Sequence, residues 1–199
     1  MKPTAIPVAT VVSAFLFVSL SGAVSAQTAA APDPATQAAP TELPSFSVLD
    51  EHSATVSSER FRGKVTLFDF WATWCMPCQF TLPELEALHQ RFDGQGGFSV
   101  AGIAIDSGMG GGVRARRFAK RLGVTYPIYH DFGADSARAA FAVRTVPQMF
   151  LVDGDGAVLR HWVGEPDFSE VIAEVEKAVG AGAEAATEAA AGDAAAGGR

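Results

Sequence analysis

The chain contains only two cysteines, Cys75 and Cys78, and two residues separate them. Thiols at this spacing can exchange with an external disulfide, because one thiolate attacks and the second thiol then resolves the mixed disulfide. A stabilising disulfide framework would need several widely spaced pairs, and a four-ligand zinc site would need two more ligands. The cysteine count therefore predicts one local, reversible disulfide, and we expect no metal and no other cofactor.

A helix is expected to start at the cysteines and to continue to Phe92. Its buried stripe at helical spacing would comprise Cys78, Thr81, Leu85, Leu88 and Phe92. Cys75 would then lie at the exposed tip, where the partial positive charge and the free N–H groups of the helix N-terminus favour a thiolate. Pro77 suits the first turn, and Pro83 should kink the helix. The geometry predicts that Cys75 attacks and Cys78 resolves, and the alternative is an inert disulfide or two buried thiols.

Strands and helices alternate around this motif. The apolar run at 65–70 suits a central strand covered on both faces. The expected elements are a hairpin at 46–49 and 55–56, strands at 65–70 and 98–105, a Gly-rich loop at 107–112, a helix at 113–122, a short strand at 127–129, a helix from the cap Asp135 to 141, a hairpin at 149–152 and 157–163 around Asp153-Gly154-Asp155-Gly156, and a helix at 168–179 capped by Asp167. This order predicts an α/β fold with a central mixed sheet and helices on both faces.

Residues 1–26 have the features of an export signal. Lys2 supplies a positive start, 8–20 is apolar, and Val24-Ser25-Ala26 offers a small-residue cleavage site. The alternative is an uncleaved N-terminal anchor, since the uncharged stretch 3–31 could nearly span a bilayer. Both alternatives place the folded part outside the cytoplasm, in the periplasm or secreted, and the second attaches it to the membrane.

Two segments of biased composition flank the expected domain at 43–179. Residues 27–42 are rich in Ala and Pro and predict a flexible or extended linker. Residues 180–199 are mostly Ala and Gly without an apolar face, so this tail is expected to be disordered.

The charge distribution limits the classes of partner. A formal net charge of −7 argues against nucleic acid, which needs a basic face. The helix expected at 113–122 is locally basic, with Phe118 and Leu122 as its inner stripe; it is a solvated face or, alternatively, a docking surface for a partner or anionic lipid. Its cations are Arg114, Arg116, Arg117, Lys120 and Arg121.

Residues 69–78, Asp-Phe-Trp-Ala-Thr-Trp-Cys-Met-Pro-Cys, resemble the active-site segment of thioredoxins. The chain is most similar to the exported TlpA/ResA-like thiol–disulfide oxidoreductases, which carry a redoxin domain. The similarity covers 43–179 and includes Pro44-Ser45-Phe46-Ser47, Arg62-Gly63-Lys64 and 145–150. It implies a thioredoxin-like fold with an N-terminal β-hairpin and a helix–strand insert at about 108–141. It also implies an enzyme that exchanges disulfides with protein disulfide or dithiol substrates.

The same resemblance suggests which residues meet the substrate. It implies that Pro147 is cis and packs against the disulfide, so that backbone groups at Val146 pair with an extended substrate segment. Trp74 is expected to shield the disulfide and to contact substrates together with Met76 and Pro77, whereas Trp71 is equally compatible with a core position.

Asp69 is the candidate proton carrier. Many TlpA/ResA-like proteins have a Glu near the buried thiol where this chain has Thr81, and they commonly have Asn in place of Asp69. A carboxyl group in an apolar strand should have a raised pKa and could exchange a proton with Cys78. The alternative is that Asp69 lies at a strand end, where it reaches solvent or caps a helix.

The sequence favours a periplasmic disulfide reductase, and three other functions are its alternatives. A peroxidase of peroxiredoxin type would carry Thr where Ala72 stands, and a copper chaperone would resemble Cys-x-x-x-Cys with a distal His. A disulfide oxidase differs only in reduction potential, which Met76-Pro77 does not fix. The resemblance favours a reductase fed by a membrane electron donor and acting on apocytochrome c, a copper-site assembly protein or another oxidised partner.

Overall fold

The computed structural model describes residues 39–92, 97–134 and 136–196. The predicted export signal at 1–26 and most of the linker at 27–42 lie outside these residues. In the described part, no helix is long and apolar enough to cross a membrane.

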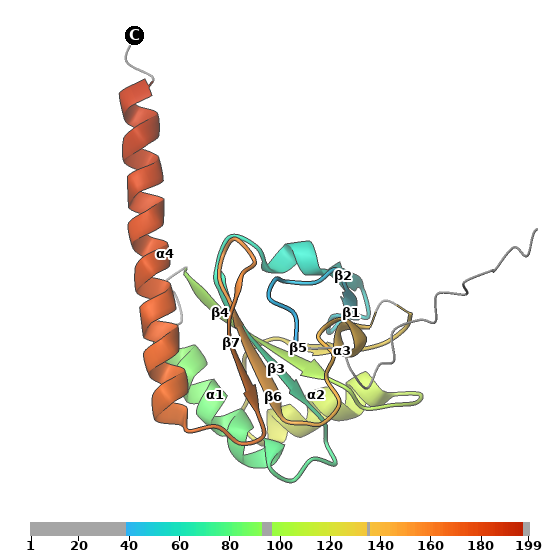
Figure 1. Cartoon of the computed structure of the whole chain (residues 1–199). Coiled ribbons are helices and arrows are strands. Elements are labelled where there is room, and N and C mark those ends of the chain that lie inside the picture. Colours follow the sequence, from blue (N-terminus) through green and yellow to red (C-terminus); the bar gives the residue numbers. More distant parts are fainter. Residues whose placement is uncertain (1–38, 93–96, 135, 197–199) are drawn as a thin grey trace, which may run out of the picture. The chain divides into compact units, whose positions relative to one another are not determined.

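The strands form one seven-stranded mixed sheet in the order β2-β1-β5-β4-β3-β6-β7 (Figure 1). The described residues also form a 3₁₀ helix, η1, and four α-helices, of which α4 follows the last strand. The elements in chain order are β1 (Ser47–Leu49), β2 (Thr55–Ser57), η1 (Ser58–Phe61), β3 (Val65–Trp71), α1 (Cys78–Phe92), β4 (Phe98–Ala104), α2 (Gly111–Arg121), β5 (Ile128–His130), α3 (Ala137–Ala140), β6 (Gln148–Val152), β7 (Val158–Val163) and α4 (Phe168–Ala196). This confirms the predicted α/β class, the central mixed sheet and the N-terminal hairpin.

β3 lies at the centre of the sheet, and all seven of its residues are buried. It pairs in parallel with β4 and antiparallel with β6, so that Asp69 lies between Gly102 and Met149. The continuous apolar run is thus explained by burial on both faces, as expected for a central strand.

The two faces of β3 have different chemistry because side chains alternate along a strand. Phe68 and Phe70 enter an aromatic cluster whose ring centroids lie 4.7–5.9 Å apart, and whose other members include Phe46, Phe141 and Phe150. Leu67, Asp69 and Trp71 point to the opposite face, where the Trp71 ring lies 6.2 Å from Phe118 of α2. The site residues on β3 belong to this second face.

The segments that flank the predicted domain at 43–179 are partly structured. On the N-terminal side, the Val158 N–H donates to the Thr41 carbonyl and Glu42 bridges to Ala157. At the other end, the predicted disorder at 180–199 is wrong for residues 180–196, since α4 continues to Ala196 (Figure 1). Alanine has the highest helix propensity, so the segment is helical, and Ala178 and Val179 are the last of the α4 side chains described that pack against the core.

One smaller prediction needs correction and another is refined. The cap of α3 is Ser136, whose side chain accepts from the Ala139 N–H, and Asp135 lies outside the described residues. On α2, Phe118 and Leu122 pack against the core as predicted but are half-buried, and the fully buried stripe consists of Gly111, Gly112, Ala115 and Ala119. Small residues occupy this stripe because the helix packs closely on β5, where a Cβ on Gly112 would lie 3.0 Å from the His130 side chain.

Candidate active site

Cys75 lies in the loop after β3 and Cys78 is the first residue of α1, and the two form a disulfide with an S–S distance of 2.08 Å and a Cα–Cα distance of 5.3 Å. The Cys75 N–H donates to the Ala72 carbonyl at 3.1 Å, which turns the chain directly after the strand. The predicted buried stripe of α1 is confirmed, because Cys78, Thr81, Leu85, Leu88 and Phe92 are all buried. Cys78 therefore lies at the first turn, on the side of the helix that faces the core.

Cys75 is not exposed, contrary to the prediction: its exposed fraction is 4%, and that of Cys78 is 0%. The disulfide holds the Cys75 side chain against the start of α1, where Cys75 Sγ accepts a hydrogen bond from the Cys78 N–H at 3.3 Å. The N–H groups at a helix start have no intrahelical partner, so this contact can stabilise negative charge on the sulfur.

The surface beside the disulfide is apolar. Trp74 is 68% exposed and Met76 is 64% exposed, and Pro77 is also exposed. Phe80, on the first turn of α1, extends the same stretch of chain with another exposed aromatic ring. Exposed large apolar groups in one patch are typical of surfaces that bind other proteins.

The cis conformation implied for Pro147 is confirmed by the Val146–Pro147 peptide bond. Pro147 is buried directly before β6, and Val146 is half-buried. Gln148 braces this turn, since its side-chain amide donates to the Thr145 carbonyl at 3.0 Å while its side-chain oxygen lies 2.9 Å from His161 Nε2. The contacts of Pro147 with the disulfide and of Val146 with substrate stay predictions.

Asp69 lies in the middle of β3 with an exposed fraction of 0%. Neither carboxyl oxygen has a hydrogen-bond partner among the described residues. Burial without compensation raises the pKa of Asp69 to about 8. The alternative role at a strand end, in contact with solvent or as a cap, is therefore wrong, because β3 extends two residues beyond Asp69.

Thr81, which stands at the position of the family Glu, is also fully buried. Its hydroxyl donates to the Cys78 carbonyl within α1 at 3.2 Å. A threonine hydroxyl does not titrate in the neutral range, so Thr81 supplies packing and a helix hydrogen bond rather than a proton carrier. Asp69 is the buried acid on the face of β3 that α1 and α2 cover.

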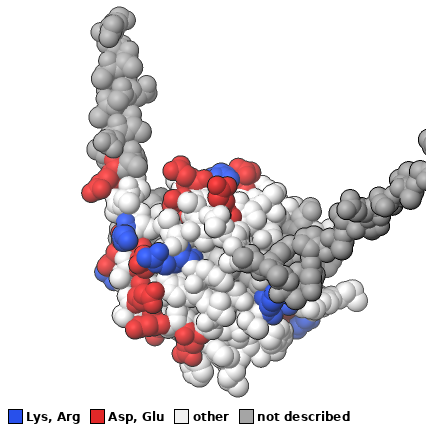
Figure 2. All heavy atoms as spheres, in the orientation of Figure 1, with Lys and Arg blue, Asp and Glu red and all other residues white. Residues whose placement is uncertain are grey.

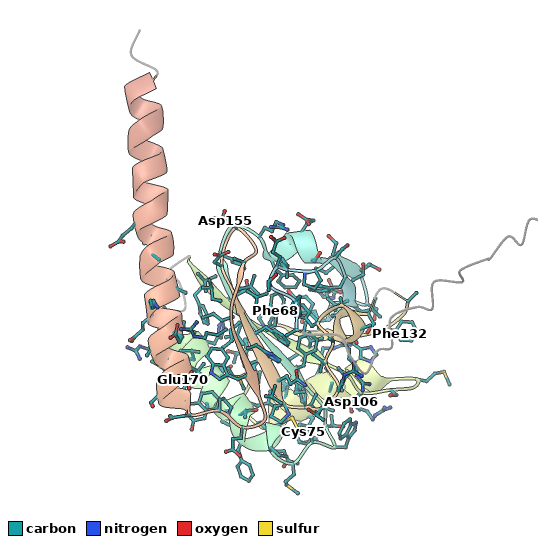
Figure 3. All side chains as sticks on the ribbon, in the orientation of Figure 1. Phe68, Cys75, Asp106, Phe132, Asp155 and Glu170 are labelled. Atoms are coloured by element: carbon teal, nitrogen blue, oxygen red, sulfur yellow. A yellow bond between two sulfur atoms is a disulfide. The ribbon has the colours of Figure 1, made fainter. Side chains whose placement is uncertain are left out.

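Asp106 is a site residue that the sequence analysis missed. It follows β4, is 3% exposed and accepts from the Thr73 N–H at 3.0 Å and from the Thr73 hydroxyl. Figure 3 shows Asp106 and Cys75 at the same edge of the sheet. The signal was available, since the carboxyl ends of the parallel strands β3 and β4 must meet at one edge. Asp106 thus fixes the segment that leads into Trp74 and Cys75.

No group of three or more His, Cys, Asp or Glu side chains that could hold a metal ion occurs in the part of the chain that the structure describes. The disulfide, the start of α1 and Asp106 lie at the carboxyl ends of β3 and β4, and Asp69 is a buried acid within β3. Such an arrangement supports thiol–disulfide exchange with a proton acceptor on the core side.

Comparison with protein families gives a match to the AhpC/TSA family over residues 39–161. Among curated proteins, the chain is 30% identical over 124 residues to the thiol–disulfide oxidoreductase ResA of Bacillus thuringiensis subsp. konkukian, a match that covers 62% of this chain and 69% of that protein. It is 28% identical over 123 residues to the thioredoxin-like protein YneN of Bacillus subtilis, covering 62% and 70% of the two chains.

Solved structures give the same result. A thiol:disulfide interchange protein of the thioredoxin family from Chlorobium tepidum superposes with a TM-score of 0.58 at 26% identity, covering 72% of this chain and 99% of that one. A thiol:disulfide interchange protein from a Bacteroides species has a TM-score of 0.61 at 22% identity over 72% of this chain and 91% of its own, which supports the fold alone.

Proposed function

The chain belongs to the AhpC/TSA family and is a thiol–disulfide oxidoreductase of thioredoxin-like fold, and on this premise we propose that it is an exported disulfide reductase. The observation that carries the proposal is the Cys75–Cys78 disulfide at the start of α1, beside the exposed side chains of Trp74 and Met76. The dithiol form would be the reductant, and this disulfide would be the only redox group that the reaction needs.

In the forward reaction, the Cys75 thiolate attacks one sulfur of a substrate disulfide, and the other substrate sulfur leaves as a thiolate. Cys78 then loses its proton and attacks Cys75 Sγ, which releases the second substrate thiolate and closes the Cys75–Cys78 disulfide. Two electrons pass from the enzyme dithiol to the substrate. A dithiol donor must return these electrons, and we propose a membrane protein for this step.

The surroundings of the disulfide suit these two roles. The Cys78 N–H that contacts Cys75 Sγ favours the attacking thiolate, and the full burial of Cys78 keeps the resolving thiol away from external disulfides. We propose that Trp74, Met76 and Pro77 contact the substrate protein, while Pro147 supports the disulfide and Val146 pairs with an extended substrate segment.

Asp69 is proposed to take the proton of Cys78 during resolution. Its buried, unpartnered carboxyl group has a pKa of about 8, close to that of an ordinary thiol, so a proton can pass between the two groups at small cost. Thr81 cannot titrate, although many TlpA/ResA-like proteins have a Glu at this position of the helix. We therefore propose that Asp69 on β3 is the proton carrier instead.

The location and the partners complete the proposal. The predicted signal or anchor at residues 1–26 supports a periplasmic or secreted domain, attached to the membrane if the segment is retained. The resemblance to ResA-type proteins supports oxidised protein substrates such as apocytochrome c or a copper-site assembly protein. Ala72, at the position where a peroxidase would carry Thr, argues against peroxide as the substrate.

The reduction potential of the pair, measured against glutathione or dithiothreitol, tests the direction of electron flow. We expect a value near or below about −200 mV, and a value near about −120 mV, typical of a strong oxidant, would overturn the reductase. Reduction of insulin should be lost in Cys75→Ser, whereas Cys78→Ser should accumulate a mixed disulfide. Tight binding of Cu(I) by a wild-type chain that reduces no disulfide would favour a chaperone instead.

A further inference from the structure

Seven large apolar side chains are exposed in the described part of the chain, and all of them lie at one edge of the sheet. They belong to the segments that follow β3, β4 and β5, or to the last residue of β7. They are Trp74, Met76, Phe80, Met109, Val113, Phe132 and Val163. Single exposed apolar residues are ordinary, but several of them gathered in one place mark a surface that binds another molecule.

The strand register explains this distribution. Trp71, Ala104 and His130 lie in one row across the parallel strands β3, β4 and β5. The segments that follow these strands therefore emerge at the same edge, which also carries the Cys75–Cys78 disulfide. β7 runs parallel to β3, because both pair antiparallel with β6, so its last residue, Val163, lies at this edge as well.

Buried polar contacts join the segments that follow β3, β4 and β5. The Asp106 carboxylate accepts a hydrogen bond from the Thr73 N–H at 3.0 Å, and His130 Nε2 lies 2.8 Å from the Asp106 carbonyl oxygen. The His130 ring stacks on that of Phe132, with centroids 6.1 Å apart. Figure 3 shows Cys75, Asp106 and Phe132 one after another along this edge. The exposed side chains are thus held in place relative to the disulfide, and such preorganisation lowers the cost of binding.

A hollow of about 420 Å³ lies beside Phe132, between the start of α2 and the last residues of β1 and β5. We call it the distal hollow. Its walls include the glycine-rich segment 108–112, in which Met109 is exposed, and the exposed Val113. Arg116 is the only Lys, Arg, Asp or Glu among its described lining residues. A hollow of this size and composition can take a large apolar side chain.

The wall formed by the glycine-rich segment has a fixed shape. A Cβ on Gly111 would collide with the Asp106 carbonyl and lie 2.9 Å from His130 Nε2, so the chain approaches these groups as only glycine allows. The Arg114 guanidinium donates to the Met109 carbonyl at 2.9 Å. The backbone at Met109 is therefore anchored, while its side chain, which is 99% exposed, faces solvent.

We propose that the distal hollow binds a large apolar side chain of the protein substrate and selects substrates that carry one near the reactive cysteine. This inference rests on the proposed exchange with protein disulfides. The distal hollow lies on the same edge as Trp74 and Met76, so a protein bound at the disulfide extends over both. The occupant is thus a segment of the substrate itself, continuous with the part that reacts.

The spacing of the strands sets which substrate residue reaches the distal hollow. β5 lies two strands from β3, about 10 Å along the sheet, and an extended chain covers this distance in about three residues. Val146, which we propose pairs with the substrate, precedes β6 on the opposite side of β3. One flank of the substrate cysteine would then lie at Val146, and the other would cross the ends of β4 and β5. We expect the third or fourth residue of that flank to enter the distal hollow.

The test uses two synthetic peptides, each linked to a copy of itself through its single cysteine. One carries leucine at the third and fourth positions on both sides of the cysteine, and the other carries serine there. Stopped-flow tryptophan fluorescence gives the second-order rate constant of the reduced chain with each dimer. The wild type should reduce the leucine dimer about tenfold faster, as expected when one large apolar side chain is partly buried.

The double variant Met109→Ser/Phe132→Ser should lower this preference to less than about twofold. Its rate with oxidised glutathione, which is too small to reach the distal hollow, should stay at the wild-type value. The matched variant Met109→Leu/Phe132→Leu keeps the apolar surface and should keep most of the preference. Val163→Ser is a second control, because Val163 is as exposed as Phe132, at 65%, but lies on the far side of β3; it should leave the preference unchanged.

A wild-type chain that reduces insulin but treats both dimers alike would overturn the inference, as would an unchanged preference in the double serine variant. If that variant unfolds, Met109→Ser alone decides the same ratio. An unchanged preference together with a loss of self-association in sedimentation would assign the distal hollow to a second copy of the chain and overturn the inference. The proposed function fails separately, when the wild type reduces neither dimer nor insulin.

Discussion

Glu86 and Asp69 are two buried carboxyl groups near the same tyrosine, yet their surroundings are opposite. Glu86 lies on α1 and accepts four hydrogen bonds of 2.6–3.4 Å, from Thr125, Tyr126 and Gln90. Asp69 lies on β3 and accepts none from the residues that the structure describes. Burial alone would raise the pKa of Glu86, but its hydrogen bonds outweigh this effect and lower the pKa, whereas burial raises that of Asp69 to about 8.

The difference separates a structural acid from a candidate acid–base group. Glu86 joins α1 to the chain before β5 and gains stability from its charge, because its donors favour the carboxylate. Asp69 has no hydrogen-bond partner among the described residues, so its charged form destabilises the fold. Figure 2 shows Asp and Glu side chains exposed on the visible face, where water solvates them. A buried carboxyl group without partners is therefore the one that we propose for proton transfer.

The largest expected effect is on the pH dependence of stability in Asp69→Asn. The folded pKa of about 8 lies above the unfolded value, so the folded state holds a proton that the unfolded state has lost, and wild-type stability falls as pH rises between these values. Relative to Asp69→Asn, the wild type should lose on the order of 4 kcal/mol between pH 5 and pH 8. Urea unfolding of both disulfide-bonded proteins at each pH measures this difference.

Other titrating groups are common to both proteins and cancel in that difference. A stability gap that stays constant between pH 5 and pH 8 would show that Asp69 has an ordinary pKa, and the contrast with Glu86 would disappear.

The next effect is kinetic. Asp69→Asn should slow resolution of the mixed disulfide about 10²-fold, the lower range for loss of a general base. The first attack by Cys75 should change by less than about threefold, because it needs no proton from Cys78. The wild-type resolution rate should rise with pH to an inflection near 8. Single-turnover fluorescence separates the two steps, and unchanged kinetics of both would refute the role of Asp69.

Glu86→Gln tests whether the charge of Glu86 stabilises the fold. This variant keeps the shape but loses the charge that its donors stabilise, so it should unfold about 1–3 kcal/mol more easily at pH 7. The lowered pKa means that this contribution is present above the unfolded pKa of Glu and is lost as pH falls through the folded value. The resolution rate should stay near that of the wild type, and a selective loss of resolution would contradict the structural assignment.

Thr73→Val should have the smallest effect. Asp106 resembles Glu86 in having partners, and this variant removes the Thr73 hydroxyl while the Thr73 N–H still donates to Asp106. We expect a loss of about 1 kcal/mol in unfolding free energy, together with a modest decrease in turnover. Thermal unfolding and insulin reduction measure both. A Thr73→Ser variant, which keeps the hydroxyl, should remain close to the wild type in both measurements.

Much of the redox segment could be predicted from local sequence. The spacing of Cys75 and Cys78 and the buried stripe from Cys78 to Phe92 are local patterns, so the disulfide and the orientation of α1 follow from them. The exposure of Cys75 could not be predicted, because it depends on where the closed disulfide places its sulfur. The end of α4 was mispredicted because the tail has no apolar face, which suggested disorder. Its alanine residues have high helix propensity, so the helix continues to Ala196.

By itself, the sequence determined the redox pair, the alternation of strands and helices, and the presence of an acid in the central strand. Only the tertiary structure decided that Asp69 has no partner, that Glu86 has several, and that Trp71 and Tyr126 meet Asp69 around Gly102. Hydrogen-bond satisfaction and desolvation depend on residues far apart in the chain, such as β3 and the segment before β5. For that reason, residue type alone could not distinguish Glu86, whose charge its donors stabilise, from Asp69, the acid that we propose moves a proton.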